Sequence, residues 1–326
     1  MPQPLISVII PTYNKGPLLV RTLQALSQQT VPPDDVEVLV IDDGSTDGTE
    51  AVVAGSSSDD RLRYVRQDNL GAGSARNHGA QLAQGDILVF LDADIVLDSD
   101  ALAVHQDAHS QFDRSLMISR ILPMTPNPHG LEDLLFQETM DFGGTDKVMT
   151  WRHAITQCLS IRREHFVEVG GFDTNLRRCQ DIEFGYRAVQ QGLLVRYLSQ
   201  CHARHNHSMS LDERCRVERN NHRGYAALFR KHPGLTTELA HLRDKSDVNW
   251  HSDSLPLIVR KVARRTLATA YPRTVMRFAW VALNSTTGSE RLKRWLYWKI
   301  VASYQLLGYQ EGIRSLSSAE AAHPDQ

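Results

Sequence analysis

The sequence lacks the features that mark exported or membrane-spanning proteins. Its 326 residues include only 4 cysteines, and none of them forms a Cys-x-x-Cys pair. Sparse cysteines without such pairs are typical of free thiols in a reducing compartment. No apolar run approaches the roughly 18 residues of a transmembrane helix. The short apolar stretch at 5–10 follows no basic residue, so we expect no signal peptide. The sequence therefore predicts a cytoplasmic protein, at most peripheral to a membrane.

The charge is nearly balanced overall but unevenly distributed. The net charge is −2, yet residues 255–315 hold 11 lysines and arginines against 2 acidic residues. The chain length suggests two domains, or one large α/β domain with an appendage. We therefore expect the basic segment to belong to a separate unit with its own surface or partner. Nucleic acid is not expected as that partner, because no recognition motif accompanies the charge.

The first hundred residues alternate between strand and helix patterns. Apolar runs of strand length occupy 5–10, 36–41, 62–65 and 87–91. This alternation predicts a parallel sheet with helices on both faces. Polar clusters follow the first, second and fourth runs. Because parallel strands end at the same edge of a sheet, these clusters are expected to meet there.

The fourth predicted strand ends in Asp92-Ala93-Asp94. Two carboxylates one residue apart are costly to bury unless a positive group neutralises them. A divalent cation carrying phosphate oxygens would do so, since hard cations take oxygen ligands. The alternative interpretation is a solvated turn that caps the following helix.

A glycine-rich segment, Gly71-Ala72-Gly73-Ser74-Ala75-Arg76, precedes this strand. It nearly matches the dinucleotide fingerprint GxGxxG. However, Arg76 replaces the third glycine, and the segment follows the third strand rather than the first. We therefore do not expect nicotinamide or flavin binding. A small-residue loop with an arginine near a helix start still suits an anionic ligand.

Six motifs occur in order between residue 5 and about residue 207. They are Ser-Val-Ile-Ile-Pro-Thr-Tyr-Asn (7–14), Ile-Asp-Asp-Gly-Ser-Thr-Asp-Gly-Thr (41–49), Asn-Leu-Gly…Ala-Arg-Asn (69–77), Asp-Ala-Asp (92–94), Gly-Gly-Phe-Asp (170–173) and Asp-Ile-Glu-Phe-Gly-Tyr-Arg (181–187). Together they resemble a family 2 glycosyltransferase. The resemblance implies a Rossmann-like α/β fold of the GT-A type.

The resemblance covers residues 1–210, with a donor-binding half at 1–112 and an acceptor-side half at 113–210. Residues 211–326 lie outside it. Their pattern predicts a basic helical extension, broken at Pro233, Pro256 and Pro272.

The resemblance also implies a donor-binding set at the sheet edge. This set is Pro11, Thr12, Tyr13, Asp43, Gly71, Arg76, Asp92 and Ala93. Within it, Pro11 and Tyr13 would border the nucleobase pocket, and Asp43 would pair with uracil. Arg76 would lie near the donor, and Asp92 would contact ribose or metal.

The metal ligands follow from the same resemblance. Asp94 would bind Mn²⁺ or Mg²⁺ on the donor diphosphate. Some relatives use a downstream histidine as a second protein ligand. In those that share the Glu-Phe-Gly-Tyr-Arg pattern, His205 fits best, ahead of His207 and His202, although all three histidines could be polar loop residues. Zinc is not expected, because no Cys/His spacing suits it.

Asp181 stands where the family places its general base. The family motif usually reads Glu-Asp, whereas this chain has Gln180-Asp181, which leaves open how Asp181 is tuned. The structural alternative is that Asp181 and Glu183 cap a helix, whose first turn favours negative charge.

The function implied is an inverting, metal-dependent glycosyltransferase. It would move a hexosyl or N-acetylhexosaminyl group from a nucleotide sugar, UDP-linked, to an acceptor hydroxyl. The acceptor stays open between a glycan, a lipid-linked sugar, a small molecule and a peptide. The alternative is a catalytically silent sugar-nucleotide or glycan-binding protein of the same fold, which Gln180 favours. A nucleotidyltransferase is not expected, because the glycine-rich first loop and lysine of such enzymes are missing.

The basic segment 255–315 supports two interpretations. Trp295 and Trp298 lie three residues apart beside cations, and basic amphipathic helices can bind anionic membranes. That interpretation implies peripheral contact with the inner face of the membrane and a lipid-linked acceptor, as in polysaccharide biosynthesis. The alternative is a helical subdomain that packs its aromatic residues on the catalytic core.

Overall fold

The computed structural model describes most of the chain as two compact units, Met1–Ser208 and Met209–Gln326. The described residues are 5–55, 61–124, 141–206, 209–235, 248–250, 252–284 and 289–322. Residues 131–140, for which the sequence pattern predicts a helix, and the alternative metal ligand His207 lie outside them. The division of residues 1–210 into donor and acceptor halves stays a prediction.

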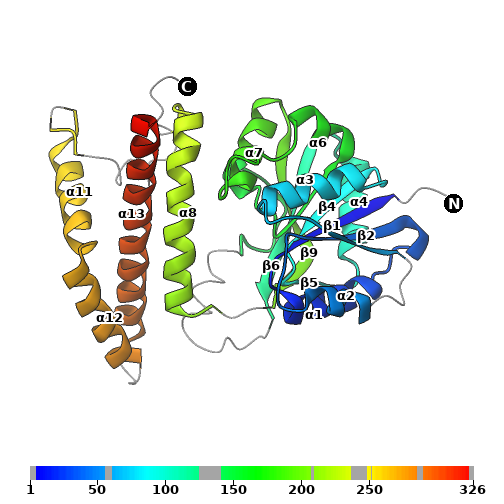
Figure 1. The fold of residues 1–326 in the computed structure, drawn as a ribbon, viewed down its shortest axis with the longest axis horizontal. Coiled ribbons are helices and arrows are strands. Elements are labelled where there is room, and N and C mark those ends of the chain that lie inside the picture. The colour runs from blue at the N-terminus through cyan, green and yellow to red at the C-terminus, as the bar shows by residue number, and fades with distance from the viewer. Residues whose placement is uncertain are drawn as a thin grey trace. The chain divides into compact units, whose positions relative to one another are not determined.

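The first unit is built on one mixed sheet (Figure 1). Its strands are β1 Ile6–Thr12, β2 Val36–Asp42, β3 Leu62–Arg66, β4 Ile87–Leu91, β5 Ile95–Leu97, β6 Ser115–Pro123, β7 Lys147–Met149, β8 Cys158–Arg162 and β9 Leu194–His205. Their order is β3-β2-β1-β4-β8-β6-β9-β5, with β7 paired to β9. The first four strands pair in parallel, as predicted. β8 runs antiparallel to β4 and β6, which makes the sheet mixed.

Helices cover both faces of this sheet and complete three layers (Figure 1). They are α1 Gly16–Ser27, α2 Thr49–Gly55, α3 Ala72–Leu82, α4 Ala101–Gln111, α6 Arg163–Val169 and α7 Gln180–Gln190. Leu23 of α1 and Val53 of α2 pack with α4 on one face. Ala75 of α3, Phe166 of α6 and Phe184 of α7 pack on the other. Apolar side chains alternate between the two faces of β1 and β2, so one sheet feeds both cores.

The structure corrects the predicted end of the first strand and the alternative assignment of His205 to a loop. The sequence predicts that Pro11 ends the first strand, but β1 continues to Thr12 and Pro11 lies opposite Ile41. Pairing with β4 stops at Ile9, so the missing N–H of proline interrupts no ladder on that side. Second, β9 includes His205, which was weighed as a residue of a polar loop.

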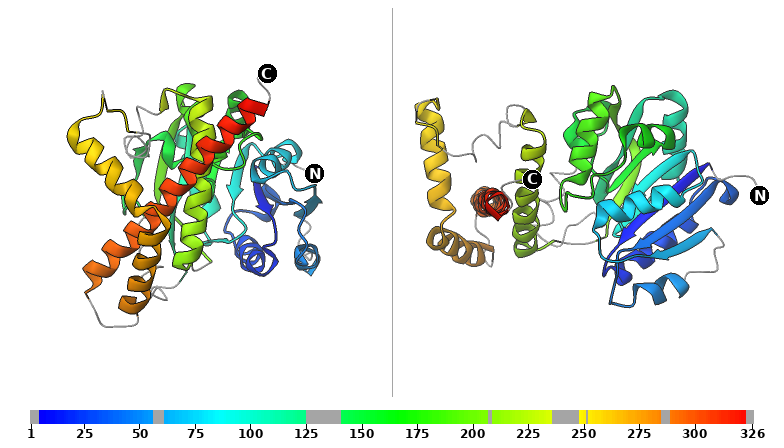
Figure 2. Two further views of the ribbon diagram at one scale, coloured as in Figure 1. Left: turned by 60° about the vertical axis from the view of Figure 1, so that its left-hand side comes forward. Right: turned by 45° about the horizontal axis from the view of Figure 1, so that its top comes forward.

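The second unit is helical, with α8 Leu211–Lys231, α11 Leu255–Leu267, α12 Ala270–Asn284 and α13 Glu290–Ala322. α13 packs along α8 (Figure 2), so closely that a Cβ added to Gly308 would lie 2.0 Å from the Arg219 carbonyl oxygen. α8 ends before Pro233, as predicted. Pro256 and Pro272 instead lie in the first turns of α11 and α12, where a proline is tolerated.

No helix in the described ranges combines the length and the apolar character that crossing a bilayer requires.

Candidate active site

The carboxyl ends of β1 and β2 are joined where the predicted donor-binding residues begin. The Asp43 N–H donates a hydrogen bond to the Thr12 carbonyl at 2.8 Å. Thr12 is buried, whereas the side chain of Tyr13 is 48% exposed. The aromatic ring therefore lies at the surface, beside two strand ends that hold each other in place.

Asp43 is a buried carboxylate that anchors the glycine-rich segment. Its Oδ1 accepts hydrogen bonds from Gln67 Nε2 at 2.8 Å and from the Leu70 N–H at 2.9 Å. Its Oδ2 accepts one from the Gly71 N–H at 2.8 Å, and Gly71 has a φ of +96° that glycine adopts readily. These donors fill three of the roughly four acceptor sites of a carboxylate. Asp43 thus ties the end of β2 to the start of α3.

Arg76 on α3 is paired with Asp92 at the end of β4. Arg76 Nη2 lies 2.7 Å from Asp92 Oδ1, and the Arg76 side chain is buried while that of Asp92 is 32% exposed. Burial raises the pKa of Asp92; Arg76 opposes this, and the charges of Asp94 and Asp181 add to it. The first turn of α7, which carries Asp181, therefore reaches the same sheet edge as the Asp-Ala-Asp motif.

Asp94 lies next to two basic groups. Lys15 Nζ is 2.7 Å from Asp94 Oδ2. Antiparallel pairing of β5 with β9 sets His205 opposite Ile95, and the Asn206 N–H donates to the Asp94 carbonyl at 2.8 Å. Burial would raise the pKa of Asp94, but His205 and Lys15 more than offset it, so the pKa is lowered. Asp94 is therefore held as a carboxylate.

This donor set suits a divalent cation. A carboxylate and an imidazole are both ligands of such ions, and the Lys15 ammonium already brings a positive charge to Asp94 Oδ2. Asp94 and His205 could supply two ligands, so an ion held between them would take further oxygens from elsewhere.

Among the described residues, a different cluster of two carboxylates and a histidine is compact enough to hold a metal ion. Ligating atoms of Asp113, Glu164 and His165 lie within 4.8 Å of one another. They sit at the opposite edge of the sheet, where β8 ends and β6 begins. His165 Nε2 lies 3.4 Å from Asp113 Oδ1, and its Nδ1 lies 3.4 Å from Oε2 of Glu168, which is outside the cluster. This cluster is therefore separate from the Asp-Ala-Asp motif.

The start of α7 contributes Asp181. Cys179, two residues before Asp181, has a φ of +63°. This strained backbone conformation often occurs at functional sites. Asp181 is half-buried, and its Oδ1 accepts a hydrogen bond from the Ile182 N–H at 2.8 Å. Most of its acceptor capacity is therefore unused by the described residues.

The neighbours of Asp181 have packing roles. Gln180 is buried, and a Cβ added to Gly73 would lie 3.2 Å from its Cγ, so it packs against the start of α3. Glu183 is fully buried and pairs with Arg187 at 2.8 Å. Of the two acids weighed as helix caps, Glu183 is therefore part of an internal ion pair.

Two residues beside the site, Asn14 and Lys15, were not predicted from the sequence to belong to it. In the described part of the chain, Asn14 (φ +52°) and Cys179 are the two non-glycine residues with positive φ. Asn14 was identifiable in principle, since asparagine tolerates this conformation. Lys15 was not, because its partner Asp94 lies 79 residues away.

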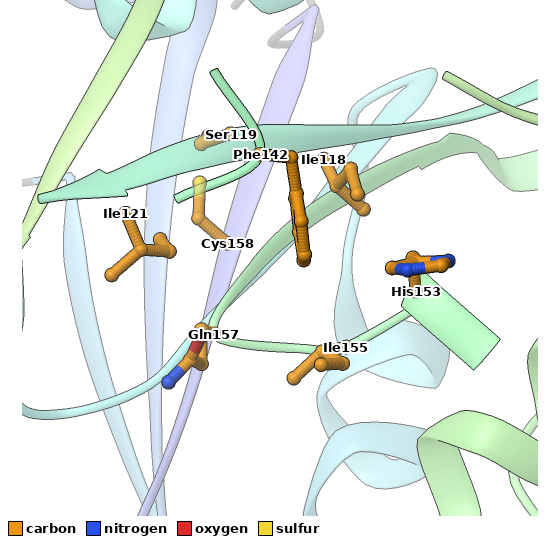
Figure 3. Close-up of a pocket in the computed structure, with 8 residues that line it drawn as sticks. All are labelled: Ile118, Ser119, Ile121, Phe142, His153, Ile155, Gln157 and Cys158. Atoms are coloured by element: carbon orange, nitrogen blue, oxygen red, sulfur yellow. The ribbon is translucent and has the colours of Figure 1, made fainter. Parts of the chain in front are cut away.

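A small hollow of about 20 Å³ adjoins the end of β4 (Figure 3). Its lining is Ile118, Ser119, Ile121, Phe142, His153, Ile155, Gln157 and Cys158. The Gln157 carbonyl accepts a hydrogen bond from the Asp92 N–H at 3.0 Å, and Cys158 lies opposite Leu91. The hollow therefore borders Asp92 and belongs entirely to the predicted acceptor-side half.

Comparison with known proteins decides the family. The model of glycosyl transferase family 2 matches residues 7–169. The chain belongs to this family. Validoxylamine A glucosyltransferase from Streptomyces hygroscopicus subsp. limoneus is 35% identical over 221 residues, which cover 58% of this chain and 49% of the relative. This family 2 chain spans about half the length of the curated relatives it matches.

Solved structures confirm the predicted GT-A fold of this family 2 protein. Mannosyltransferase PcManGT from Pyrobaculum calidifontis, in complex with GDP-Man and Mn²⁺, has a TM-score of 0.61 at 21% identity and covers 100% of this chain and 89% of its own. S. aureus TarS 1-349, in complex with UDP-GlcNAc, has a TM-score of 0.52 at 17% identity, with coverages of 96% and 92%. At these identities the likeness concerns the fold.

Proposed function

We propose that this family 2 protein transfers a hexosyl or N-acetylhexosaminyl group from a UDP-sugar to an acceptor hydroxyl, with inversion. The observation that carries the proposal is the gathering of Asp92, Asp94 and Asp181 at one sheet edge, where their charges interact. Structural neighbours support a nucleotide-sugar donor, since they hold UDP-GlcNAc or GDP-Man. The motif set favours UDP.

Asp181 is proposed as the general base. Its position in the first turn of α7 places the carboxylate at the positive end of the helix dipole. Its unused acceptor capacity suits an incoming hydroxyl. Asp181 would take the hydroxyl proton while that oxygen attacks the anomeric carbon opposite the departing diphosphate. A single displacement of this kind inverts the anomeric configuration.

The donor would be held from three sides. The exposed ring of Tyr13 suits stacking on the base, and Asp43 keeps one acceptor site for it. Arg76 keeps Asp92 oriented by a hydrogen bond of 2.7 Å. Asp94 and His205 would hold Mn²⁺ or Mg²⁺, which supplies positive charge for the leaving diphosphate when bound.

A donor panel with an Asp181→Asn variant tests this proposal. UDP or GDP release would be measured with UDP-glucose, UDP-GlcNAc and GDP-mannose in the presence of Mn²⁺. We expect turnover with a UDP-sugar. Asp181→Asn should keep UDP and Mn²⁺ binding but lose roughly 10²- to 10⁴-fold in rate, the usual contribution of a general base.

Asp113→Asn is the matched control, because it makes the same change at the opposite sheet edge and should leave the rate unchanged. Full activity in Asp181→Asn would contradict the base assignment. Donor binding without turnover in the unmodified protein would instead favour the silent binding protein.

The second unit supports a finer proposal on the acceptor. Exposed apolar side chains recur at helical spacing in Leu255, Val259 and Val262 of α11 and in Val275, Phe278 and Val281 of α12. Exposed Arg260 lies among them. Trp280 and Tyr297, by contrast, are buried together with ring centroids 5.7 Å apart. We propose that the outward faces contact an anionic membrane on its cytoplasmic side, and that the acceptor is lipid-linked.

Vesicle flotation tests the membrane proposal. The protein should float with vesicles of phosphatidylglycerol and phosphatidylcholine at low salt and be released at high salt. Phe278→Asp should reduce flotation. Val167→Asp, which changes an exposed apolar residue of the first unit, is the control. No flotation at low salt would contradict the proposal.

A further inference from the structure

Lys15 forms an ion pair with Asp94, the proposed metal ligand. The proposed reaction assigns no role to this ion pair. The Lys15 Nζ lies 2.7 Å from Asp94 Oδ2, and the two side chains are 39% and 13% exposed. This is the distance of a charge-assisted hydrogen bond. A cation is thus already bound to one oxygen of the carboxylate proposed to ligate the divalent ion.

The backbone around Lys15 is fixed by the loop after β2. The Asn14 N–H donates to Ser45 Oγ at 2.9 Å, and the Thr46 N–H donates to Asn14 Oδ1 at 2.8 Å. On the other side, the Gly16 N–H donates to Asp47 Oδ2 at 3.1 Å. Bonds on both flanks, with Asn14 in a left-handed conformation, hold the lysine at the start of α1. Its contact with Asp94 is therefore built into the fold.

The charges at this edge explain why a counter-cation is needed. The negative charges of Asp94 and Asp181 both act on Asp92, and Arg76 already pairs with Asp92. Without a cation at Asp94, this cluster would carry a costly excess of negative charge. A divalent ion and the Lys15 ammonium would therefore compete for the Asp94 carboxylate.

We propose that Lys15 is an internal counter-cation that competes with the divalent ion for Asp94 and yields to it when the ion arrives with a nucleotide diphosphate. The inference rests on the metal-dependent function proposed above. Asp94 and His205 offer two ligands, so the ion gains further oxygens from the diphosphate. The diphosphate also brings negative charge that the released ammonium can pair with. Free ion should therefore bind weakly, and ion with nucleotide should bind well.

Titrations of Mn²⁺ into Lys15→Met, with and without UDP or GDP, test this inference. Free Mn²⁺ would be followed by electron paramagnetic resonance. Without nucleotide, we expect Lys15→Met to bind Mn²⁺ roughly threefold to tenfold more tightly, the range for loss of a half-exposed charged competitor. With Mn²⁺ present, it should bind UDP several-fold more weakly. A merely structural role would not move the two affinities in opposite directions.

Lys147→Met is the control, because this lysine lies on β7, away from Asp94, and both affinities should stay unchanged. Lys15→Arg should restore both, and circular dichroism melts would verify folding. Equal or weaker Mn²⁺ binding by folded Lys15→Met would overturn the inference alone. If the unmodified protein binds no Mn²⁺ with or without nucleotide, both the inference and the metal-dependent function fail.

Discussion

Two sets of carboxylates in the first unit differ in how their oxygens are used. The structural set, Glu37, Asp42 and Glu183, is buried, and protein donors surround its oxygens. Asp42, for example, accepts hydrogen bonds from the Ser45 N–H at 2.8 Å and from the Tyr64 hydroxyl at 2.5 Å.

The site set, Asp92, Asp94 and Asp181, keeps more unused capacity. Asp92 and Asp94 each share one oxygen with one basic side chain, and Asp181 accepts from one backbone N–H. The site carboxylates are also less buried, since Asp92 and Asp181 are half-buried whereas the structural set is buried. Partial exposure and acceptor capacity that the described residues leave unused distinguish the site carboxylates.

The largest expected effect concerns the structural set. Arg187→Met would leave Glu183 buried without its counter-charge. Breaking a buried ion pair in this way costs about 3–5 kcal/mol. We expect the free energy of unfolding, measured by urea denaturation, to fall by that order.

Lys15→Met breaks an ion pair of the site set and is the counterpart of Arg187→Met in the structural set. Because Lys15 is 39% exposed, its loss should change the unfolding free energy by no more than about 1 kcal/mol. Equal losses in the two variants would show that the sets do not differ.

An intermediate effect is expected from two buried histidines of α4. His105 bonds to Ser160 Oγ at 2.7 Å and to Ser119 Oγ at 2.9 Å. Burial lowers the pKa of His105 to about 4 and that of His109 to about 3. Both pKa values are below the value of about 6.5 for an unfolded histidine. At a pH between the folded and unfolded pKa values, the unfolded chain therefore binds more protons than the folded chain.

The histidine contribution to stability is therefore complete above pH 6.5 and is lost as the pH falls towards 4. Each histidine should contribute up to about 1.4 kcal/mol per pH unit in that window. Urea denaturation at pH 7, 6 and 5 measures this slope, and the double variant His105→Gln/His109→Gln should flatten it. A flat profile in the unmodified protein would refute the prediction.

A loss smaller than that of Arg187→Met is expected at Asp43, which belongs to the site by position but resembles the structural set in its hydrogen bonds. Asp43→Asn removes the charge and one acceptor from the Leu70 and Gly71 amides. We expect a loss of about 1–2 kcal/mol in unfolding free energy and faster hydrogen exchange at those two amides. The exposed Asp68→Asn is the control, and unchanged exchange in Asp43→Asn would contradict its anchoring role.

The strand and helix patterns in the sequence predicted the first half of the sheet well. Strands β1 to β4 lie within a few residues of the segments predicted for them, because each forms from a local run with one periodicity. The predicted end of the first strand at Pro11 was wrong, because the effect of a proline depends on which neighbouring strand still pairs at its position. β5 and β9 were missed, because three residues or an irregular strand give no periodic signal.

The sequence by itself determined the family, the parallel half of the sheet and the edge at which Asp43 and Asp92 meet, since local patterns and parallel topology suffice for that. Only the tertiary structure decided the pairings at the site. His205 comes beside Asp94 through the register of β5 and β9, and Lys15 reaches Asp94 across 79 residues. Such contacts depend on strand register and loop anchoring, which no local stretch of sequence encodes.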